Sequence, residues 1–182
     1  MSKKCILILG GARSGKSRFA QNLAGKLSEK VLFVATGGAI DEEMRSRIEE
    51  HQKARPRTWY TLETPVKLGE RIPEQIGNAD VVIIDCITIL ISNLLVGKED
   101  DKYKEEQVTT EIDQLIECMD KLEVTFILVS NEVGLGLVPE SRLGRFYRDL
   151  LGRANQLLAQ HADEVYVMVA GIPVEVKRHN RW

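Results

Sequence analysis

The chain has 182 residues and a formal net charge of −2 at pH 7, a length that suits one domain with a sheet covered on both faces. The near-neutral charge argues against binding to nucleic acid or to an anionic membrane surface. Its three cysteines lack metal-binding spacing, and the sequence contains neither an export signal nor an apolar run of about 20 residues. We therefore expect a cytoplasmic protein with no membrane span and no nucleic-acid partner.

The most informative stretch is GGARSGKS at residues 10–17, which matches the phosphate-binding loop pattern G-x-x-x-x-G-K-[ST] at every fixed position. An apolar run precedes it, and apolar residues at helical spacing follow it, as in the strand–loop–helix unit that carries this loop. Glycines allow backbone N–H groups to approach a triphosphate closely. We expect Lys16 to reach the β- and γ-phosphates and the Ser17 hydroxyl to bind Mg²⁺.

Apolar runs alternate with amphipathic stretches, which predicts an α/β fold with a mainly parallel sheet flanked by helices. Strands are expected at residues 5–9, 31–35, 59–62, 79–85, 124–129 and 165–169. Helices are expected from residue 15 and at 41–54, 65–76, 86–95, 108–119 and 143–161. Between them we expect a charged connection at 98–106 and a loop at 133–139. One recombinase-like P-loop NTPase domain then covers residues 1–177, and 178–182 form a tail.

Three carboxylates follow predicted strands and are candidates for ligand binding. Asp85 closes the most apolar strand, where phosphate-loop enzymes place the carboxylate that holds Mg²⁺ directly or through water. The alternative is an aspartate that merely begins a loop. Glu63 and Glu132 are candidates for contacts with a ribose hydroxyl or a metal, and a solvated or capping role fits them equally well.

His51 allows two interpretations. On the predicted helix it extends an apolar stripe and is flanked by Arg47 and Arg55. That setting suits a phosphate neighbour, and a neutral histidine can act as a nucleophile on phosphorus. A partly buried histidine stabilised by the dipole of the helix C-terminus fits the same spacing, and the spacing by itself favours this structural role.

Several ordered motifs extend the pattern beyond the phosphate loop. They are AT at 35–36, DEEM at 41–44, Arg47-Ile48 with His51, Arg55-Pro56 with Trp59, DCIT at 85–88, SNLL at 92–95, NEVG at 131–134, VPE at 138–140, and Gly152 with Asn155-Gln156. In this combination, from residue 6 to about 177, the chain resembles the bifunctional adenosylcobinamide kinase/adenosylcobinamide-phosphate guanylyltransferase family of cobalamin biosynthesis.

The resemblance implies two reactions. The first phosphorylates the aminopropanol hydroxyl of adenosylcobinamide with ATP or GTP. The second transfers GMP from GTP, through a histidine, to adenosylcobinamide phosphate and yields adenosylcobinamide-GDP. The matching histidine is His51, which together with Lys16 is then catalytic, and Glu50 stands where some family members have a second histidine. The resemblance also implies a homo-oligomer, because known family members are trimers.

The resemblance further implies a nucleotide site and a metal site. The guanine nucleotide would contact Gly10, Gly11, Ala12, Arg13, Ser14, Gly15, Lys16, Ser17, Ala35, Thr36, Gly37, Gln52, Lys53, Ala54, Arg55, Glu63 and Asp85. Ser17 and Asp85 would hold Mg²⁺. The Gly37-Gly38 turn is an atypical version of the family's turn, and we hypothesise that it lets the helix of His51 move toward the loop.

Two other functions stay open on the sequence alone. A P-loop small-molecule kinase would transfer the γ-phosphate without forming GMP on the protein, and His51 would be structural. A non-catalytic nucleotide-dependent ATPase related to recombinases would hydrolyse slowly and have no acceptor. A switch GTPase is disfavoured, because NEVG at 131–134 does not match the guanine-reading motif N-K-x-D.

Overall fold

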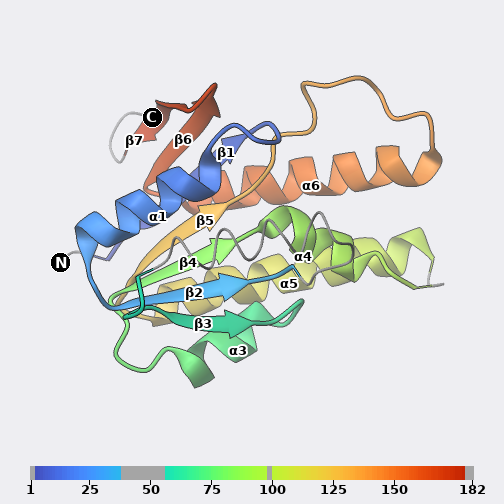
Figure 1. The fold of residues 1–182 in the computed structure, drawn as a ribbon. Coiled ribbons are helices and arrows are strands. Elements are labelled where there is room, and N and C mark those ends of the chain that lie inside the picture. Colours follow the sequence, from blue (N-terminus) through green and yellow to red (C-terminus); the bar gives the residue numbers. More distant parts are fainter. Residues whose placement is uncertain (1–2, 38–55, 98–99, 179–182) are drawn as a thin grey trace.

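The structure is a computed structural model that describes residues 3–37, 56–97 and 100–178. Seven strands of these residues form one sheet in the order β3-β2-β4-β5-β1-β6-β7 (Figure 1). The strands are β1 (Cys5–Gly10), β2 (Val31–Ala35), β3 (Tyr60–Glu63), β4 (Val81–Asp85), β5 (Thr125–Val129), β6 (Glu164–Val169) and β7 (Ile172–Arg178). The pairing is parallel except between β6 and β7, which confirms the predicted mainly parallel sheet.

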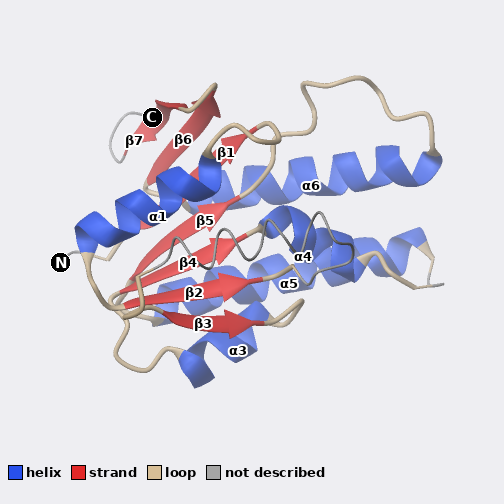
Figure 2. Cartoon of the chain, in the orientation of Figure 1, coloured by secondary structure: helices blue, strands red, loops and turns tan. Residues whose placement is uncertain are grey.

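Helices cover both faces of this sheet (Figure 2). They are α1 (Lys16–Leu27), α3 (Leu68–Gln75), α4 (Ile87–Leu94), α5 (Asp101–Lys121) and α6 (Arg142–His161). Side chains alternate along each strand, so Val81 and Ile83 of β4 join the cluster beneath α1, whereas Val82 and Ile84 join the cluster beneath the other helices. Burial on both faces explains why the strands read as uninterrupted apolar runs.

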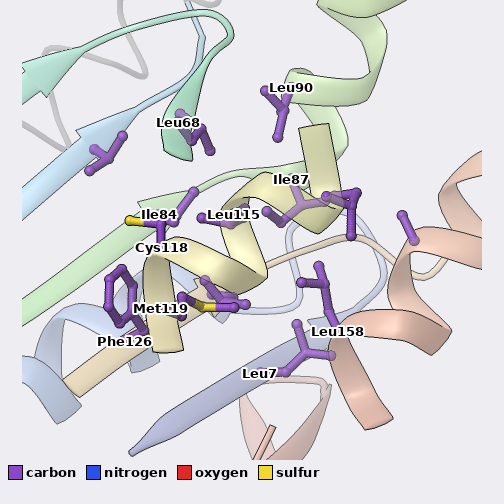
Figure 3. Packing of buried hydrophobic residues seen from close by; sticks show 14 of the residues in the cluster. Leu7, Leu68, Ile84, Ile87, Leu90, Leu115, Cys118, Met119, Phe126 and Leu158 are labelled. Atoms are coloured by element: carbon purple, nitrogen blue, oxygen red, sulfur yellow. The ribbon is translucent and has the colours of Figure 1, made fainter. Parts of the chain in front are cut away.

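The larger of the two clusters holds the sheet against α5 and α6 (Figure 3). Leu7 and Phe126 project from the sheet, Leu115 and Met119 from α5, and Leu158 from α6. All five are at most 1% exposed, and burying a side chain of this size contributes about 2 kcal/mol to stability. None of the helices within the described ranges is long and apolar enough to cross a membrane.

The charged stretch expected as a connection at 98–106 is helical from Asp101 onward, so that prediction is wrong for most of its length. The side chain of Asp100 accepts a hydrogen bond from the backbone N–H of Tyr103 at 2.8 Å and caps α5. Asp101 and Glu105 then form ion pairs with Arg142 and Arg153 of α6. Charged residues that in the sequence suggest a solvated linker thus form ion pairs with a helix some 40 residues further along the chain.

Strand β7 was not predicted from the sequence. It follows β6 through a tight turn in which Ala170 and Gly171 both have positive φ, of 50° and 85°. In β7 the apolar side chains face solvent and a charged one faces the protein, the reverse of the usual pattern. Val174 and Val176 are exposed, while Lys177 donates to the carbonyl oxygens of Ala159 and Gln160 at the end of α6, each at 2.9 Å. Because a lysine occupies the inward position, the sequence does not show the hydrophobic alternation by which a strand is predicted. Residues 179–182 of the expected tail lie outside the described residues.

Candidate functional site

The phosphate-loop motif forms the connection between β1 and α1. Strand β1 ends at Gly10, and α1 begins at Lys16 with Gly15 as its N-cap at φ +95°. Gly11, Ala12 and Arg13 are exposed at the tip of the loop. The backbone N–H of Gly171 donates to the carbonyl oxygen of Ser14 at 3.1 Å, so the turn between β6 and β7 supports the loop from one side.

Lys16 is buried although it is charged. Its side chain is 7% exposed, and its Nζ donates to the carbonyl oxygen of Gly11 at 2.6 Å. The ammonium group is thus held across the loop that it belongs to. The Oγ of Ser14 is buried and has no hydrogen-bond partner among the described residues. The first turn of α1 contains no acidic residue, so its N–H groups and dipole favour an anion.

Gly10 is required sterically. Its φ is +148°, and a Cβ at this position would lie 2.7 Å from the carbonyl oxygen of Met168 and 2.8 Å from the Oγ of Ser14. A Cβ at Gly11, by contrast, would meet nothing within 4 Å. The first glycine of the motif therefore allows β6 and the loop to approach β1 closely, whereas Gly11 has no such role.

We predict that Gly10→Ala lowers the free energy of unfolding by about 2 kcal/mol or more, because strain at a positive φ adds to the clash with the backbone of β6. Gly11→Ala is the matched control and should change it by less than about 0.5 kcal/mol. Urea denaturation without nucleotide measures both changes. Equal stability of the two variants would contradict the steric role of Gly10.

Asp85 and Lys16 both influence the pKa of the Cys86 thiol, which directly follows Asp85 in the chain. Burial raises the pKa of the Cys86 thiol to about 11, and the Asp85 carboxylate acts in the same direction. The Lys16 ammonium opposes both effects on the same thiol. The fold thus brings the strand-terminal carboxylate of β4 and the lysine of the loop to one thiol, although 69 positions separate them in the chain.

Thr36 and Asn93 join the ends of β2, β3 and β4. The Oγ1 of Thr36 donates to the carbonyl oxygen of Cys86 at 2.7 Å and accepts from its N–H at 2.8 Å. The Nδ2 of Asn93 donates to the carbonyl oxygens of Thr36 and Pro65, at 2.9 and 3.0 Å. Thr36 is 1% exposed, and its two hydrogen bonds hold the end of β2 against the backbone of Cys86. A Cβ at Gly37 would lie 3.1 Å from the Cδ1 of Ile89, which means that Gly37→Ala would alter packing as well as flexibility.

Glu63, Ala35 and Asp85 lie in one row across the sheet, since Ala35 is the register partner of both carboxylates. Asp85 is two strands from β1 in the sheet order, and Glu63 is four. With about 4.8 Å between neighbouring strands, these separations are about 10 Å and about 19 Å. Glu63 is therefore too far from the loop to share a phosphate group with Lys16, but an extended ligand along this edge can reach it.

The sequence reasoning did not identify a hydrogen-bond network that positions the end of β5. The Oγ1 of Thr88 accepts from the N–H of Asn131 at 2.7 Å, and Asn155 donates to the carbonyl oxygen of Asn131 at 3.0 Å. The N–H of Glu132 then donates to the carbonyl oxygen of Gly10 at 3.0 Å. These contacts place Glu132 beside the phosphate loop. The sequence does contain these residues, in the motifs at 85–88, 131–134 and 155–156. Only the fold shows that the three motifs contact one another.

Part of the predicted site lies outside the described residues. This applies to His51, to the helix expected at 41–54, and to Gln52, Lys53, Ala54 and Arg55. Ser17 follows Lys16 in the first turn of α1 and is half-buried. A separate cavity of about 270 Å³ lies between α5 and α6, and its lining residues include none of the predicted site residues that the structure describes.

Comparison with known proteins gives close matches over almost the whole chain. Residues 6–176 match the model of a family described as cobinamide kinase / cobinamide phosphate guanyltransferase. The chain is 44% identical over 180 residues to the bifunctional adenosylcobalamin biosynthesis protein CobU of Escherichia coli (strain K12), and 42% identical over 180 residues to CobU of Salmonella typhimurium (strain LT2). Each match covers 94% of this chain and 99% of the relative.

A third relative has a different name. The bifunctional adenosylcobalamin biosynthesis protein CobP of Pseudomonas aeruginosa is 40% identical over 171 residues, with 94% of this chain and 96% of the relative covered. Among solved structures, the flagellar accessory protein FlaH from Methanocaldococcus jannaschii superposes with a TM-score of 0.57 over 98% of this chain and 80% of that chain. At 17% identity this likeness concerns the fold alone, and it supports the predicted recombinase-like P-loop architecture.

Proposed function

This chain belongs to the cobinamide kinase / cobinamide phosphate guanyltransferase family, and we propose that it carries out both reactions with one phosphate loop. It phosphorylates the aminopropanol hydroxyl of adenosylcobinamide and then transfers GMP from GTP to the new phosphate. The observation that carries the proposal is the buried Lys16 held across a glycine loop, with Asp85 at the carboxyl end of β4, in a chain that matches bifunctional relatives over 94% of its length.

The loop and the start of α1 would bind the triphosphate. Backbone N–H groups of residues 11–17 and the helix dipole supply an anion site, and the unpartnered Oγ of Ser14 is a further polar group within it. Lys16 would exchange the carbonyl oxygen of Gly11 for the β- and γ-phosphates. The triphosphate would then extend along the carboxyl edge, with Ala35, Gly37 and Glu63 toward its ribose and base.

Ser17 and Asp85 are the residues that would hold Mg²⁺. The set fits this metal, because Mg²⁺ in nucleotide sites takes few protein oxygens and completes its shell with phosphate and water. When bound, the ion neutralises charge on the phosphate oxygens. Lys16 supplies the protein's own positive charge at the same point, in a buried setting where electrostatic stabilisation is strong.

The kinase step needs positioning more than covalent chemistry. The hydroxyl oxygen of adenosylcobinamide attacks the γ-phosphorus and its proton passes to water, while the bond to the β-phosphate oxygen breaks and the nucleoside diphosphate leaves. Lys16 stabilises negative charge on the transferring group, and the hydrogen bond from Glu132 to Gly10 keeps the end of β5 aligned with the loop.

The guanylyltransferase step would proceed through His51. A ring nitrogen attacks the α-phosphorus of GTP and pyrophosphate leaves, so that GMP is bound to the histidine. A phosphate oxygen of adenosylcobinamide phosphate then attacks the same phosphorus and releases the histidine. Gln52, Lys53, Ala54 and Arg55 would contact this nucleotide. The match with the bifunctional relatives supports these assignments. The trimer and the cytoplasmic location stay predictions from the sequence.

The test uses two preparations of GTP, one labelled at the α-phosphate and the other at the γ-phosphate, each with Mg²⁺. With GTP alone, α-label should become bound to the protein in an acid-labile, alkali-stable form. With adenosylcobinamide, γ-label should enter the corrinoid first and α-label second. Transfer of γ-label without any α-label on the protein would leave a simple kinase. Slow hydrolysis without any transfer would leave a nucleotide-dependent ATPase.

A further inference from the structure

Four large aliphatic side chains between the end of β5 and the first turn of α6 are exposed to solvent. Three of them belong to the connection and Leu143 lies in the first turn of α6, and we call the four together the apolar loop: Leu135, Leu137, Val138 and Leu143, which are 89%, 96%, 65% and 58% exposed. Single exposed apolar residues are ordinary, but a group of them within nine positions marks a surface that binds something.

The apolar loop is tied down at both ends. At its start, the N–H of Glu132 donates to Gly10 of the phosphate loop at 3.0 Å, and the carboxylate of Glu132 accepts from the N–H of Gly134 at 2.8 Å. At its end, Arg145 donates to the carbonyl oxygens of Pro139 and Glu140, at 3.0 and 2.6 Å. The exposure of the leucines is therefore a property of an anchored loop.

The position of the loop suggests its occupant. It leaves β5 next to the phosphate loop and runs outward, away from the sheet, to the start of α6 (Figure 1). A corrinoid that delivers its hydroxyl to the γ-phosphate has to place its body within reach of Gly10. A corrin ring is broad, carries many methyl groups and has carboxamides at its periphery. Aliphatic side chains suit the methyl-bearing face, and exposed backbone at Gly134 and Gly136 suits the carboxamides.

A different surface of the protein is better suited to contact with a second copy of the chain. Among the described residues, strand β7 is at the edge of the sheet and pairs only with β6, and Ile172, Val174 and Val176 are exposed. Such an edge suits pairing with another protein chain. The apolar loop offers no strand edge. Its link to Gly10 connects it to the catalytic site instead.

We propose that the apolar loop is the surface on which the corrin ring of the acceptor rests, an inference that itself rests on the proposed function. The double variant Leu135→Ser/Leu137→Ser tests it. The control Tyr60→Ser removes one exposed side chain, 62% exposed, in the outer strand β3 at the far edge of the sheet. Both variants should unfold thermally close to the parent protein.

Binding is measured directly, by equilibrium dialysis of the coloured adenosylcobinamide with a non-hydrolysable GTP analogue present. The Kd should rise at least about tenfold in the loop variant and stay within about twofold of the parent in the control. Formation of α-labelled protein from GTP, which needs no corrinoid, should be unchanged in both variants.

Three results would overturn the inference. The first is parental affinity in the loop variant. The second is a loss of assembly mass by light scattering in that variant, which would make the loop a contact between copies. The third is an equal loss of affinity in the control. If the parent protein bound adenosylcobinamide but transferred neither phosphate nor GMP, the proposed function would be contradicted. The proposed binding surface would not be contradicted by that result.

Discussion

Replacing Lys16 with methionine should lower the rates of γ-phosphate transfer and of protein guanylylation by about a hundredfold or more each. Lys16 is buried, and its ammonium group is at the phosphate loop, where a fixed positive charge stabilises the transferring phosphate more strongly than in water. Methionine retains the length and apolar stem of the side chain, so the fold should persist. Initial rates with γ-labelled and α-labelled GTP measure the two losses separately.

Lys26→Met is the control for this change. Lys26 lies in the last turn of the same helix and is exposed, so its loss should leave both rates within about twofold of the parent. Circular dichroism and thermal unfolding show whether Lys16→Met has kept the fold. If the folded Lys16→Met protein retained either rate within about tenfold, the lysine would not be the charge on which that reaction depends.

Replacing His51 with asparagine should abolish α-label on the protein and the formation of adenosylcobinamide-GDP, while γ-phosphate transfer continues within about threefold. Asparagine cannot form the covalent bond to phosphorus that the two-step transfer requires, whereas the kinase step uses the loop and Lys16 without a covalent intermediate. Acid lability of the label and its position in the peptide digest identify the attachment site. The product corrinoids are separated by chromatography.

His161→Asn provides the same chemical change at a position without a proposed role. The Nε2 of His161 lies 3.6 Å from the Oδ1 of Asp120, where α6 ends. Guanylylation should proceed normally in this variant. Persistent label in His51→Asn would point to another nucleophile. Loss of both reactions in His51→Asn, with the fold intact, would mean that the histidine also serves the kinase step.

The local pattern of the sequence was sufficient for β1, α1 and β4, which carry the phosphate loop and Asp85. The apolar run before Gly10, the helical spacing after Lys16 and the carboxylate that closes the strand at 81–85 all have their predicted places in the structure. Such features are local because burial on both faces requires continuous apolar strands, and a phosphate loop needs its glycines and lysine at set intervals. The motif order also identified the family, which the comparisons confirm.

Tertiary structure decided how these elements meet. The insertion of β5 between β4 and β1 separates Asp85 from the loop strand by one strand, and it brings Glu132 to Gly10. The first turns of α5 form ion pairs with α6, and Lys177 of β7 reaches the end of α6. Each of these contacts joins residues far apart in the chain. Hydrophobic periodicity reports which side of one element is buried, but not which distant partner covers it.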